Sequence, residues 1–220
     1  MAIERETLET DILIVGAGPA GLSCALKLAQ LLAADSSVTK PEVLFMDKGS
    51  YVGAHSLSGA VMDPRGIAEL IPDFKEQGAP LEAPVSGDSF YLLTEKGAIK
   101  SPLNPPPLRN HGSYIISLNK FTGWLARQVE AAGIDIYAGM AGFELLVEDG
   151  RVAGVQTVDM GLDKDGSPKG NFEPGSIVRA KVTILCEGVH GSLTRQAFEK
   201  IPELRANCQP QSYLTGVKEV

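Results

Sequence analysis

Apolar residues near the start of the chain form two short runs separated by a helical stripe. The run Asp11–Val15 is rich in β-branched residues and breaks at Gly16, which is typical of a buried strand. From Pro19 to Ala33 the apolar residues recur at helical spacing, and proline is tolerated in the first turn of a helix. A second apolar run, Glu42–Asp47, follows a polar loop. This order predicts a right-handed βαβ unit with two parallel strands.

The middle of the chain has no comparably long periodic segment. Between Gly53 and Pro107 glycine and proline are frequent and strand candidates such as Phe90–Thr94 are short, so we expect loops, a small hairpin and one short helix after Pro64. Periodicity then returns in short elements. They are an extended segment over Tyr114–Leu118, a helix over Lys120–Ala132, strands over Ile134–Tyr137, Phe143–Glu148, Arg151–Asp159 and Ile177–Leu185, a helix over Ser192–Lys200, and an extended segment over Ser212–Val220.

Two local signals refine these elements. Glu148-Asp149-Gly150 predicts a tight turn between two strands of a β-meander. Ser192 is the expected N-cap of the helix that follows it, because a serine oxygen can accept a free amide N–H. Trp124 lies among apolar residues of the Lys120–Ala132 helix, and we assign it to the core rather than to an electron relay.

Composition and charge exclude several classes of protein. With 44% hydrophobic and 21% charged residues, the 220-residue chain is typical of a globular protein rather than a disordered, collagen-like or coiled-coil chain. The net charge of −7 and the lack of Lys/Arg runs argue against nucleic-acid binding. No apolar stretch approaches the roughly 18 residues of a transmembrane helix, and Met1–Thr10 lacks the layout of a secretory signal. These features predict a cytoplasmic or matrix-like compartment.

The three cysteines have long, irregular spacings and form no C-x-x-C pair. We expect Cys24 and Cys186 to be buried free thiols, and we assign neither a disulfide nor a metal site. We assign no catalytic side chain either, because the chain has no hydrolase-like Ser/His/Asp order and no H-x-x-x-H spacing.

The strongest chemical signal is the sequence Gly16-Ala-Gly-Pro-Ala-Gly21 between the first strand and the first helix. In this context Gly16 permits the tight turn, Gly18 lets the backbone approach a pyrophosphate, and Gly21 lets the helix pack closely on the sheet. The amide N–H groups and dipole at the helix start favour an anion. The motif predicts binding of a dinucleotide.

Asp47 ends the second strand, where a carboxylate can accept hydrogen bonds from an adenosine ribose. It lies further from the motif than the usual spacing of about 20 residues, and the insertion 33–40 accounts for the difference. A 2′-phosphate would be repelled at this position, which disfavours NADP. The fold class we predict is α/β, a Rossmann-like FAD/NAD(P)-binding domain with a β-rich insertion.

Several longer motifs, spread from about Asp11 to the end of the chain, resemble those of electron transfer flavoprotein–ubiquinone oxidoreductases. The first motif occurs in many flavoproteins, whereas the second and the last are far more restricted. The motifs are Ile14-Val-Gly-Ala-Gly-Pro-Ala-Gly-Leu-Ser23, Gly53-Ala-His-Ser-Leu-Ser-Gly-Ala60, Asn110-His-Gly-Ser-Tyr-Ile115, Ala180-Lys-Val-Thr-Ile184 followed by Glu187-Gly188 and His190-Gly191, and Arg205-Ala-Asn-Cys-Gln-Pro-Gln211.

The resemblance implies an FAD enzyme that takes electrons from reduced electron transfer flavoprotein and delivers them to ubiquinone. It implies a peripheral location at the mitochondrial inner membrane, or on the cytoplasmic side of the bacterial inner membrane. Family members are longer and carry a [4Fe–4S] cluster in their C-terminal part. Cys24, Cys186 and Cys208 do not match its ligands, because such a cluster needs four suitably placed cysteines. We therefore expect membrane contact only through regions outside these residues, which by themselves should be soluble.

The resemblance also implies a division of the chain and a set of cofactor contacts. Residues 1–60 are the first FAD-binding segment, 61–113 a loop-rich insertion, 114–200 a second FAD-binding segment with the β-meander, and 201–220 the start of a truncated quinone or substrate domain. The candidate cofactor-binding residues are Gly16, Gly18, Pro19, Ala20, Gly21, Asp47, Lys48, Gly53, Ala54, His55, Ser58, Gly59, Arg127, Glu187 and Gly188.

Within this set the glycine loop would hold the FAD pyrophosphate, Asp47 the ribose, and residues 53–58 the ribityl chain or the flavin ring. Glu187-Gly188 replaces the Asp-Gly pair of related flavoproteins, and Ser117 stands where the family would have arginine. His55 is either a cofactor neighbour or a hydrogen-bonded loop residue. Arg127 is either a phosphate or adenine contact or an exposed arginine. We interpret His111 and His190 as loop residues.

Two alternative functions stay open. An FAD monooxygenase or a geranylgeranyl-reductase-like flavoenzyme shares the glycine motif but would take its electrons from NAD(P)H. The 220 residues could also form a non-catalytic FAD-binding fragment. Rapid flavin reduction by NADPH would favour the first alternative, and FAD binding without quinone reductase activity would favour the second.

Overall fold

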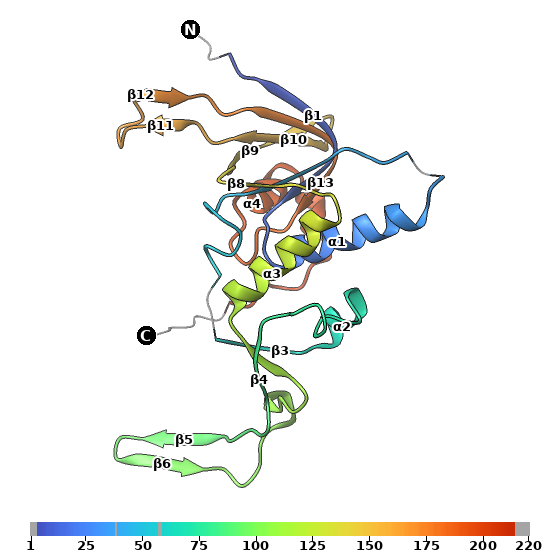
Figure 1. The fold of residues 1–220 in the computed structure, drawn as a ribbon. Coiled ribbons are helices and arrows are strands. Elements are labelled where there is room, and N and C mark those ends of the chain that lie inside the picture. Colours follow the sequence, from blue (N-terminus) through green and yellow to red (C-terminus); the bar gives the residue numbers. More distant parts are fainter. Residues whose placement is uncertain (1–3, 38, 57–58, 214–220) are drawn as a thin grey trace.

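A computed structural model of the protein describes residues 4–37, 39–56 and 59–213 (Figure 1). Its centre is a six-stranded sheet in which four neighbouring strands are parallel and the last two form an antiparallel hairpin. The strand order is β8 (Ile136–Ala138), β2 (Val43–Asp47), β1 (Thr7–Val15), β13 (Ile177–Leu185), β10 (Arg151–Thr157) and β9 (Gly142–Glu148).

The predicted βαβ unit is present, with α1 (Pro19–Ala34) connecting the parallel strands β1 and β2. Strand β1 begins before its apolar run, because Thr7–Thr10 pair with residues 177–180 of β13. The parallel strands, the helix that connects β1 to β2 and the helices packed on the sheet establish the predicted α/β fold class.

The two faces of the sheet are covered by different elements. Ile14 and Phe45 pack into the cluster that contains α1 and α3 (Leu118–Ala131), two helices that lie side by side on one face (Figure 1). Leu13 and Met46, their neighbours along the strands, pack into a second cluster with α4 (Ser192–Lys200). Because successive strand residues point to opposite faces of the sheet, the two clusters hold β1 from both sides. They therefore fix the position of the glycine loop at the end of β1.

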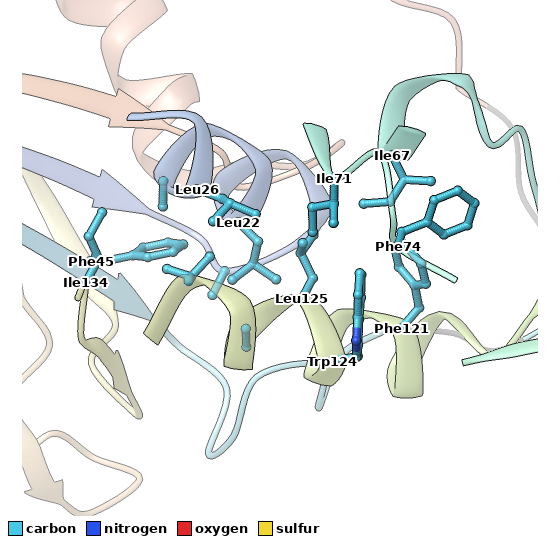
Figure 2. Close-up of a cluster of buried hydrophobic side chains, with 14 of the residues drawn as sticks. Leu22, Leu26, Phe45, Ile67, Ile71, Phe74, Phe121, Trp124, Leu125 and Ile134 are labelled. Atoms are coloured by element: carbon cyan, nitrogen blue, oxygen red, sulfur yellow. The ribbon is translucent and has the colours of Figure 1, made fainter. Parts of the chain in front are cut away.

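Trp124 is a core residue, as predicted. It is 3% exposed and lies near Leu125 and Phe121 between α3 and the α2 region (Figure 2). Its indole N–H donates to the backbone oxygen of Gln77 at 3.1 Å. This hydrogen bond satisfies the polar group of a buried tryptophan.

The middle of the chain forms the predicted insertion of short elements. One three-stranded sheet joins both ends of the insertion, and the β5–β6 hairpin extends away from the rest of the molecule (Figure 1). The elements are β3 (Ala60–Met62), α2 (Arg65–Leu70), β4 (Leu81–Pro84), β5 (Tyr91–Thr94), β6 (Gly97–Lys100), η1 (Pro106–Leu108) and β7 (Tyr114–Ile116), and later in the chain β11 (Met160–Leu162), β12 (Pro168–Glu173) and η2 (Pro202–Arg205).

Several element ends differ from the sequence predictions. Helix α3 begins at Leu118, and Ser117, at the position where arginine was expected, is its N-cap and accepts a hydrogen bond from the Lys120 amide at 3.5 Å. Ser192 is not the N-cap of α4: it is the first helical residue, and Gly191 precedes it. The expected extended segment over residues 212–220 lies almost entirely outside the described residues.

The hairpin between β9 and β10 confirms the tight-turn prediction. Asp149 and Gly150 have φ angles of 49° and 74°, both in the left-handed region. A two-residue hairpin turn of type I′ needs positive φ at both central residues, which Asp-Gly tolerates. The turn sets the register in which Arg151 pairs with Glu148.

We expect Asp159→Asn to lower the thermal unfolding midpoint at pH 7 by a few degrees. The Arg5 guanidinium donates to the Asp159 carboxylate and to the backbone oxygen of Gly175, and the Gly175 amide donates to Asp159 at 2.8 Å. Hydrogen bonds from Arg5, then Gly175, lower the pKa of Asp159 below its ordinary 3.8. The ionised pair therefore stabilises the fold above about pH 4, and this contribution is lost as the pH falls through the folded-state pKa.

Circular dichroism melts at pH 7 and pH 3 measure the effect. The difference between wild type and Asp159→Asn should shrink at the lower pH. Asp163→Asn is the matched control, because the Asp163 side chain is 58% exposed and its lysine partner lies 3.9 Å away. Equal effects of the two substitutions would contradict the prediction.

Candidate dinucleotide-binding site

The ends of three parallel strands meet at one edge of the sheet. Val15, at the end of β1, pairs with Leu185 of β13 on one flank and with Met46 of β2 on the other. The loops that follow these strands line a cavity of about 350 Å³, within the roughly 300–1,000 Å³ of typical ligand pockets. It is lined by Val15, Gly16, Ala17, Gly18, Asp47, Lys48, Gly53, His55, Ser56, Met140, Ala141, Gly142, Cys186, Glu187, Gly188, His190, Gly191 and Ser192. Open α/β sheets bind ligands at this edge.

Gly16 and Gly21 hold the glycine loop against its neighbours. Gly16 has φ of +101°, and a Cβ there would lie 2.5 Å from the backbone oxygen of Cys186. A Cβ on Gly21 would lie 2.0 Å from the backbone oxygen of Gly16. Both positions therefore require glycine: the first for backbone conformation and contact with β13, the second for the close approach of α1 to the loop.

Gly18, in contrast to Gly16 and Gly21, is not crowded by described neighbouring atoms. A Cβ on this residue would meet no described atom within 4 Å, so the space beside it is open. Gly18 is also the N-cap of α1; among the described residues, no side chain caps this helix, and its first turn contains no acidic residue. The start of α1 therefore presents unpaired amide N–H groups and a positive dipole end to the cavity, which suits a phosphate group.

The Asp47 carboxylate holds the glycine loop in place through hydrogen bonds to backbone amides. One oxygen accepts the Ala17 amide at 2.7 Å, and the other accepts the Gly49 amide, also at 2.7 Å. The side chain thus lies at the end of β2 beside the cavity, where the sequence analysis places an adenosine ribose. It fixes the glycine loop and leaves lone pairs that can accept ribose hydroxyls.

The loop after β2 forms a further part of the cavity wall. Gly53 has φ of +93°, and its backbone oxygen accepts the Asn119 side-chain amide at 2.7 Å. This bond ties the loop to the start of α3, so that Gly53, His55 and Ser56 face the cavity. Asn119 was not among the predicted site residues, because it acts on the loop from a helix distant in sequence.

Glu187 lies beyond β13, on the flank of β1 opposite Asp47. Its carboxylate accepts the Leu193 amide at 3.2 Å and the Thr194 amide at 2.7 Å, and it also accepts the Thr194 hydroxyl at 2.9 Å. Glu187 therefore caps α4, the role that the sequence analysis gave to Ser192. The Ser192 prediction was wrong because Ser192 is already the first helical residue, and the longer Glu187 side chain reaches the Leu193 and Thr194 amides.

The structure brings only some of the predicted residues to the cavity. Arg127 is exposed on α3 and does not line the cavity, so its contact with a cofactor stays a prediction. Ser58 lies outside the described residues. Gly16, Gly18, Asp47, Lys48, Gly53, His55, Glu187 and Gly188 line the cavity, whereas Pro19, Ala20, Gly21, Ala54 and Gly59 do not.

Other lining residues were missed by the sequence analysis. Met140–Gly142 follow β8, and His190–Ser192 follow β13. These residues could have been proposed from their positions alone, because residues just after parallel strands gather at the same edge of the sheet. Such a prediction requires the order of the strands in the sheet, which is set by long-range pairing.

Cys24 and Cys186 are free thiols, as predicted, but they are half-buried rather than buried; Cys208 is an exposed free thiol. Burial, and then the nearby Cys24 thiol, raises the pKa of Cys186, so this lining thiol is neutral at physiological pH. The described part of the chain contains no group of three or more His, Cys, Asp or Glu residues suited to a metal, so it offers no site that fits a [4Fe–4S] cluster. Across the same residues, every helix is too short or too polar to cross a bilayer.

The sheet order and the glycine loop between β1 and α1 define a Rossmann-like α/β fold. The description "NAD(P)-binding Rossmann-like domain" matches residues 14–72, which contain β1, α1, β2 and the loop that lines the cavity.

Curated relatives are similar to this chain over almost its whole length. The chain is 49% identical over 220 residues to electron transfer flavoprotein-ubiquinone oxidoreductase, mitochondrial, of Sus scrofa, and 48% identical to that of Homo sapiens; each match covers 99% of this chain and 35% of the relative. A probable electron transfer flavoprotein-ubiquinone oxidoreductase of Acinetobacter baylyi is 44% identical, and this chain covers 39% of it. The chain is thus homologous, over almost all its length, to the N-terminal portion of these oxidoreductases. It spans little more than a third of their length.

Solved structures support the fold. A geranylgeranyl bacteriochlorophyll reductase-like protein from Thermoplasma acidophilum has a TM-score of 0.55 and 23% identity, covering 81% of this chain and 39% of that protein. The myxobacterial FAD-dependent chondrochloren halogenase has a TM-score of 0.56 and 18% identity, covering 86% of this chain and 39% of the halogenase. At these identities the likeness concerns the fold alone.

We expect Asp47→Ala to weaken FAD binding by about 10- to 100-fold, since each tenfold corresponds to about 1.4 kcal/mol and hydrogen bonds to charged groups contribute about 1.5–3 kcal/mol. Competition between FAD and ADP, followed by flavin fluorescence, measures the loss. Asp135→Ala, which removes an exposed carboxylate outside the cavity, should bind FAD as wild type does. Unchanged affinity in Asp47→Ala would show that this carboxylate does not contribute.

Proposed function

We propose that this chain is the FAD-binding part of an oxidoreductase that passes electrons from reduced electron transfer flavoprotein to ubiquinone. The observation that carries the proposal is the open position at Gly18 beside the uncapped start of α1, in a chain homologous to these oxidoreductases. The pyrophosphate would lie at that helix start. The adenosine ribose would lie on the Asp47 flank, which leaves the Glu187 flank, across β1, for the flavin half.

FAD supplies the redox chemistry when bound, and the residues of this chain supply its position. The glycine loop offers amide N–H groups to the phosphates, and Asp47 holds that loop in place. Gly53, His55 and Ser56, together with residues of the loop after β13, line the cavity. Lys48 lines it too and would add a positive charge that suits phosphate groups.

The β5–β6 hairpin supports a peripheral location at a membrane. Leu92, Leu93 and Ile99 on the hairpin, and Leu103 just beyond it, are 61–77% exposed, and the hairpin projects from the body of the molecule (Figure 1). Exposed apolar patches of this kind mark contact surfaces, and ubiquinone is itself an apolar molecule of the bilayer. In contrast to the expectation from the sequence, which confined membrane contact to regions outside these residues, we therefore propose that this hairpin also contributes to it.

The proposal is tested by measuring which donor, reduced electron transfer flavoprotein or NADPH, reduces the bound flavin. The purified chain is first examined for flavin absorption, and the loaded protein is then mixed in a stopped-flow instrument with reduced electron transfer flavoprotein or with NADPH. Rapid flavin reduction by the flavoprotein alone is the expected result. Rapid reduction by NADPH would instead support the monooxygenase or geranylgeranyl-reductase-like alternative. Retained FAD with neither reaction, and no quinone reductase activity, would leave a non-catalytic FAD-binding fragment.

A further inference from the structure

Three residues around the start of α4 fit together as a clamp. The Glu187 carboxylate accepts two amides of the first turn, those of Leu193 and Thr194. Thr194 adds its hydroxyl to the same carboxylate oxygen. Gly191 makes room for this arrangement, because a Cβ there would lie 2.8 Å from both the Glu187 Oε2 and the Thr194 Oγ1. We call Glu187, Gly191 and Thr194 the α4 clamp.

The clamp gives the two helix starts at the cavity different roles. The start of α1 has no described side-chain cap and is open to an anion. The start of α4 already holds a carboxylate, which uses its amides and offsets its dipole. A phosphate group is therefore favoured at α1 and disfavoured at α4. Glu187 has little capacity left for a direct bond to a cofactor, since three donors already converge on its two oxygens.

The α4 clamp lies on the side of β1 where the flavin half of a bound FAD would be. Glu187 and Gly188–Gly191 follow β13, whereas Asp47 follows β2 on the other side of β1. Gly188, His190 and Gly191 line the cavity. A dinucleotide with its ribose on Asp47 and its pyrophosphate at Gly18 would therefore place its other half against the loop that the clamp holds.

We propose that Glu187 is a positioning residue: it acts through α4 to hold loop 188–191 as the wall for the flavin half, rather than binding the cofactor directly. This inference rests on the proposed binding of FAD. It predicts that the clamp affects the affinity for FAD but not for ADP, which contains only the adenosine half. It also predicts that the carboxylate protects the α4 amides before any ligand is bound.

The test compares Glu187→Gln, Thr194→Val and the double variant in the 220-residue chain. FAD and ADP affinities are measured by fluorescence titration and competition, and exchange of the Leu193 and Thr194 amides is measured by NMR without ligand. Glu187→Gln should bind FAD about tenfold more weakly, as expected for loss of charge-assisted hydrogen bonds. ADP affinity should stay within about twofold of wild type. The double variant should be no weaker than Glu187→Gln, because both substitutions break one clamp.

Each other outcome overturns the positioning role. If Glu187 binds FAD directly, Thr194→Val will leave FAD affinity unchanged or increase it, and Glu187→Gln will not speed amide exchange in the ligand-free chain. If the clamp is only structural, FAD and ADP affinities will fall equally and the melting temperature will fall with them. Absence of FAD binding in the wild type is a different failure, because it refutes the proposed function itself.

Ser192→Ala serves as the matched control. Ser192 lines the cavity beside the clamp, but its side chain forms no cap on α4. This variant should keep wild-type exchange at Leu193 and Thr194. Faster exchange in Ser192→Ala than in Glu187→Gln would contradict the assignment of the cap to Glu187.

Discussion

Gly18→Val should weaken FAD binding at least about 100-fold, because a branched side chain would fill the space that a pyrophosphate needs beside α1. The fold should survive the change. A Cβ at this position meets no described atom within 4 Å, and φ of −79° with ψ of −178° suits valine. We expect a stability loss of about 1 kcal/mol, since valine is a poorer N-cap than glycine. Flavin fluorescence titration and a circular dichroism melt measure the two quantities.

Gly66→Val is the control for this prediction. Gly66 also has open space around it, but it lies on α2 and does not line the cavity. It should keep or slightly raise helix stability, because valine is a better helix former than glycine, and it should lose no FAD affinity. If Gly18→Val retained FAD while Gly66→Val behaved as expected, the pyrophosphate could not lie beside Gly18.

Gly21→Ala should lower both the stability and the FAD affinity. The added Cβ would lie 2.0 Å from the Gly16 backbone oxygen and 3.3 Å from the Phe45 ring, so α1 must move away from the loop. The loop cannot follow easily, because Gly16 is itself confined by the Cys186 backbone. Overpacking of this kind costs about 1–3 kcal/mol, and the backbone contact favours the upper end. Urea unfolding measures the loss as a lower midpoint at an unchanged slope.

Gly18→Ala provides the comparison for Gly21→Ala, since both add one methyl group to the same motif. The first should mainly weaken FAD binding, and the second should also destabilise the chain. Equal stability of Gly21→Ala and wild type would show that α1 does not depend on close contact with the glycine loop.

The βαβ unit and the phosphate loop could be predicted because their signals are local. Asp11–Val15, the glycine motif and Glu42–Asp47 follow one another directly, and each residue type has a physical reason to stand where it does. The Asp149-Gly150 turn was predictable for the same reason, since positive φ is required at two adjacent residues.

The other half of the site depends on contacts between distant segments. Nothing near Glu187 in the sequence shows that its carboxylate reaches Thr194, because Ser192 offers the more usual capping side chain. The Asn119 side chain, on α3, donates a hydrogen bond to the backbone oxygen of Gly53 in the loop after β2. For Arg127 the sequence left two interpretations open, a phosphate or adenine contact or an exposed arginine, and the structure places it in solvent and outside the cavity lining.

The insertion was predicted only in outline for a related reason. Its strands β3, β4 and β7 are three or four residues long, and each is too short to show an alternating pattern. Their sheet is formed by pairing Ala60–Met62 with Tyr114–Ile116 across the whole insertion. That pairing follows from tertiary packing, which a local pattern does not contain.

The most direct test of the account is an NMR titration of the 220-residue chain with ADP and then with FAD. The account predicts that ADP shifts the amides of the glycine loop and of Asp47–Gly49, and that FAD additionally shifts loop 188–191 across β1. Amide shifts confined to surfaces away from the ends of β1, β2 and β13, or no shifts in a folded chain, would contradict the claim that this edge of the sheet binds the dinucleotide.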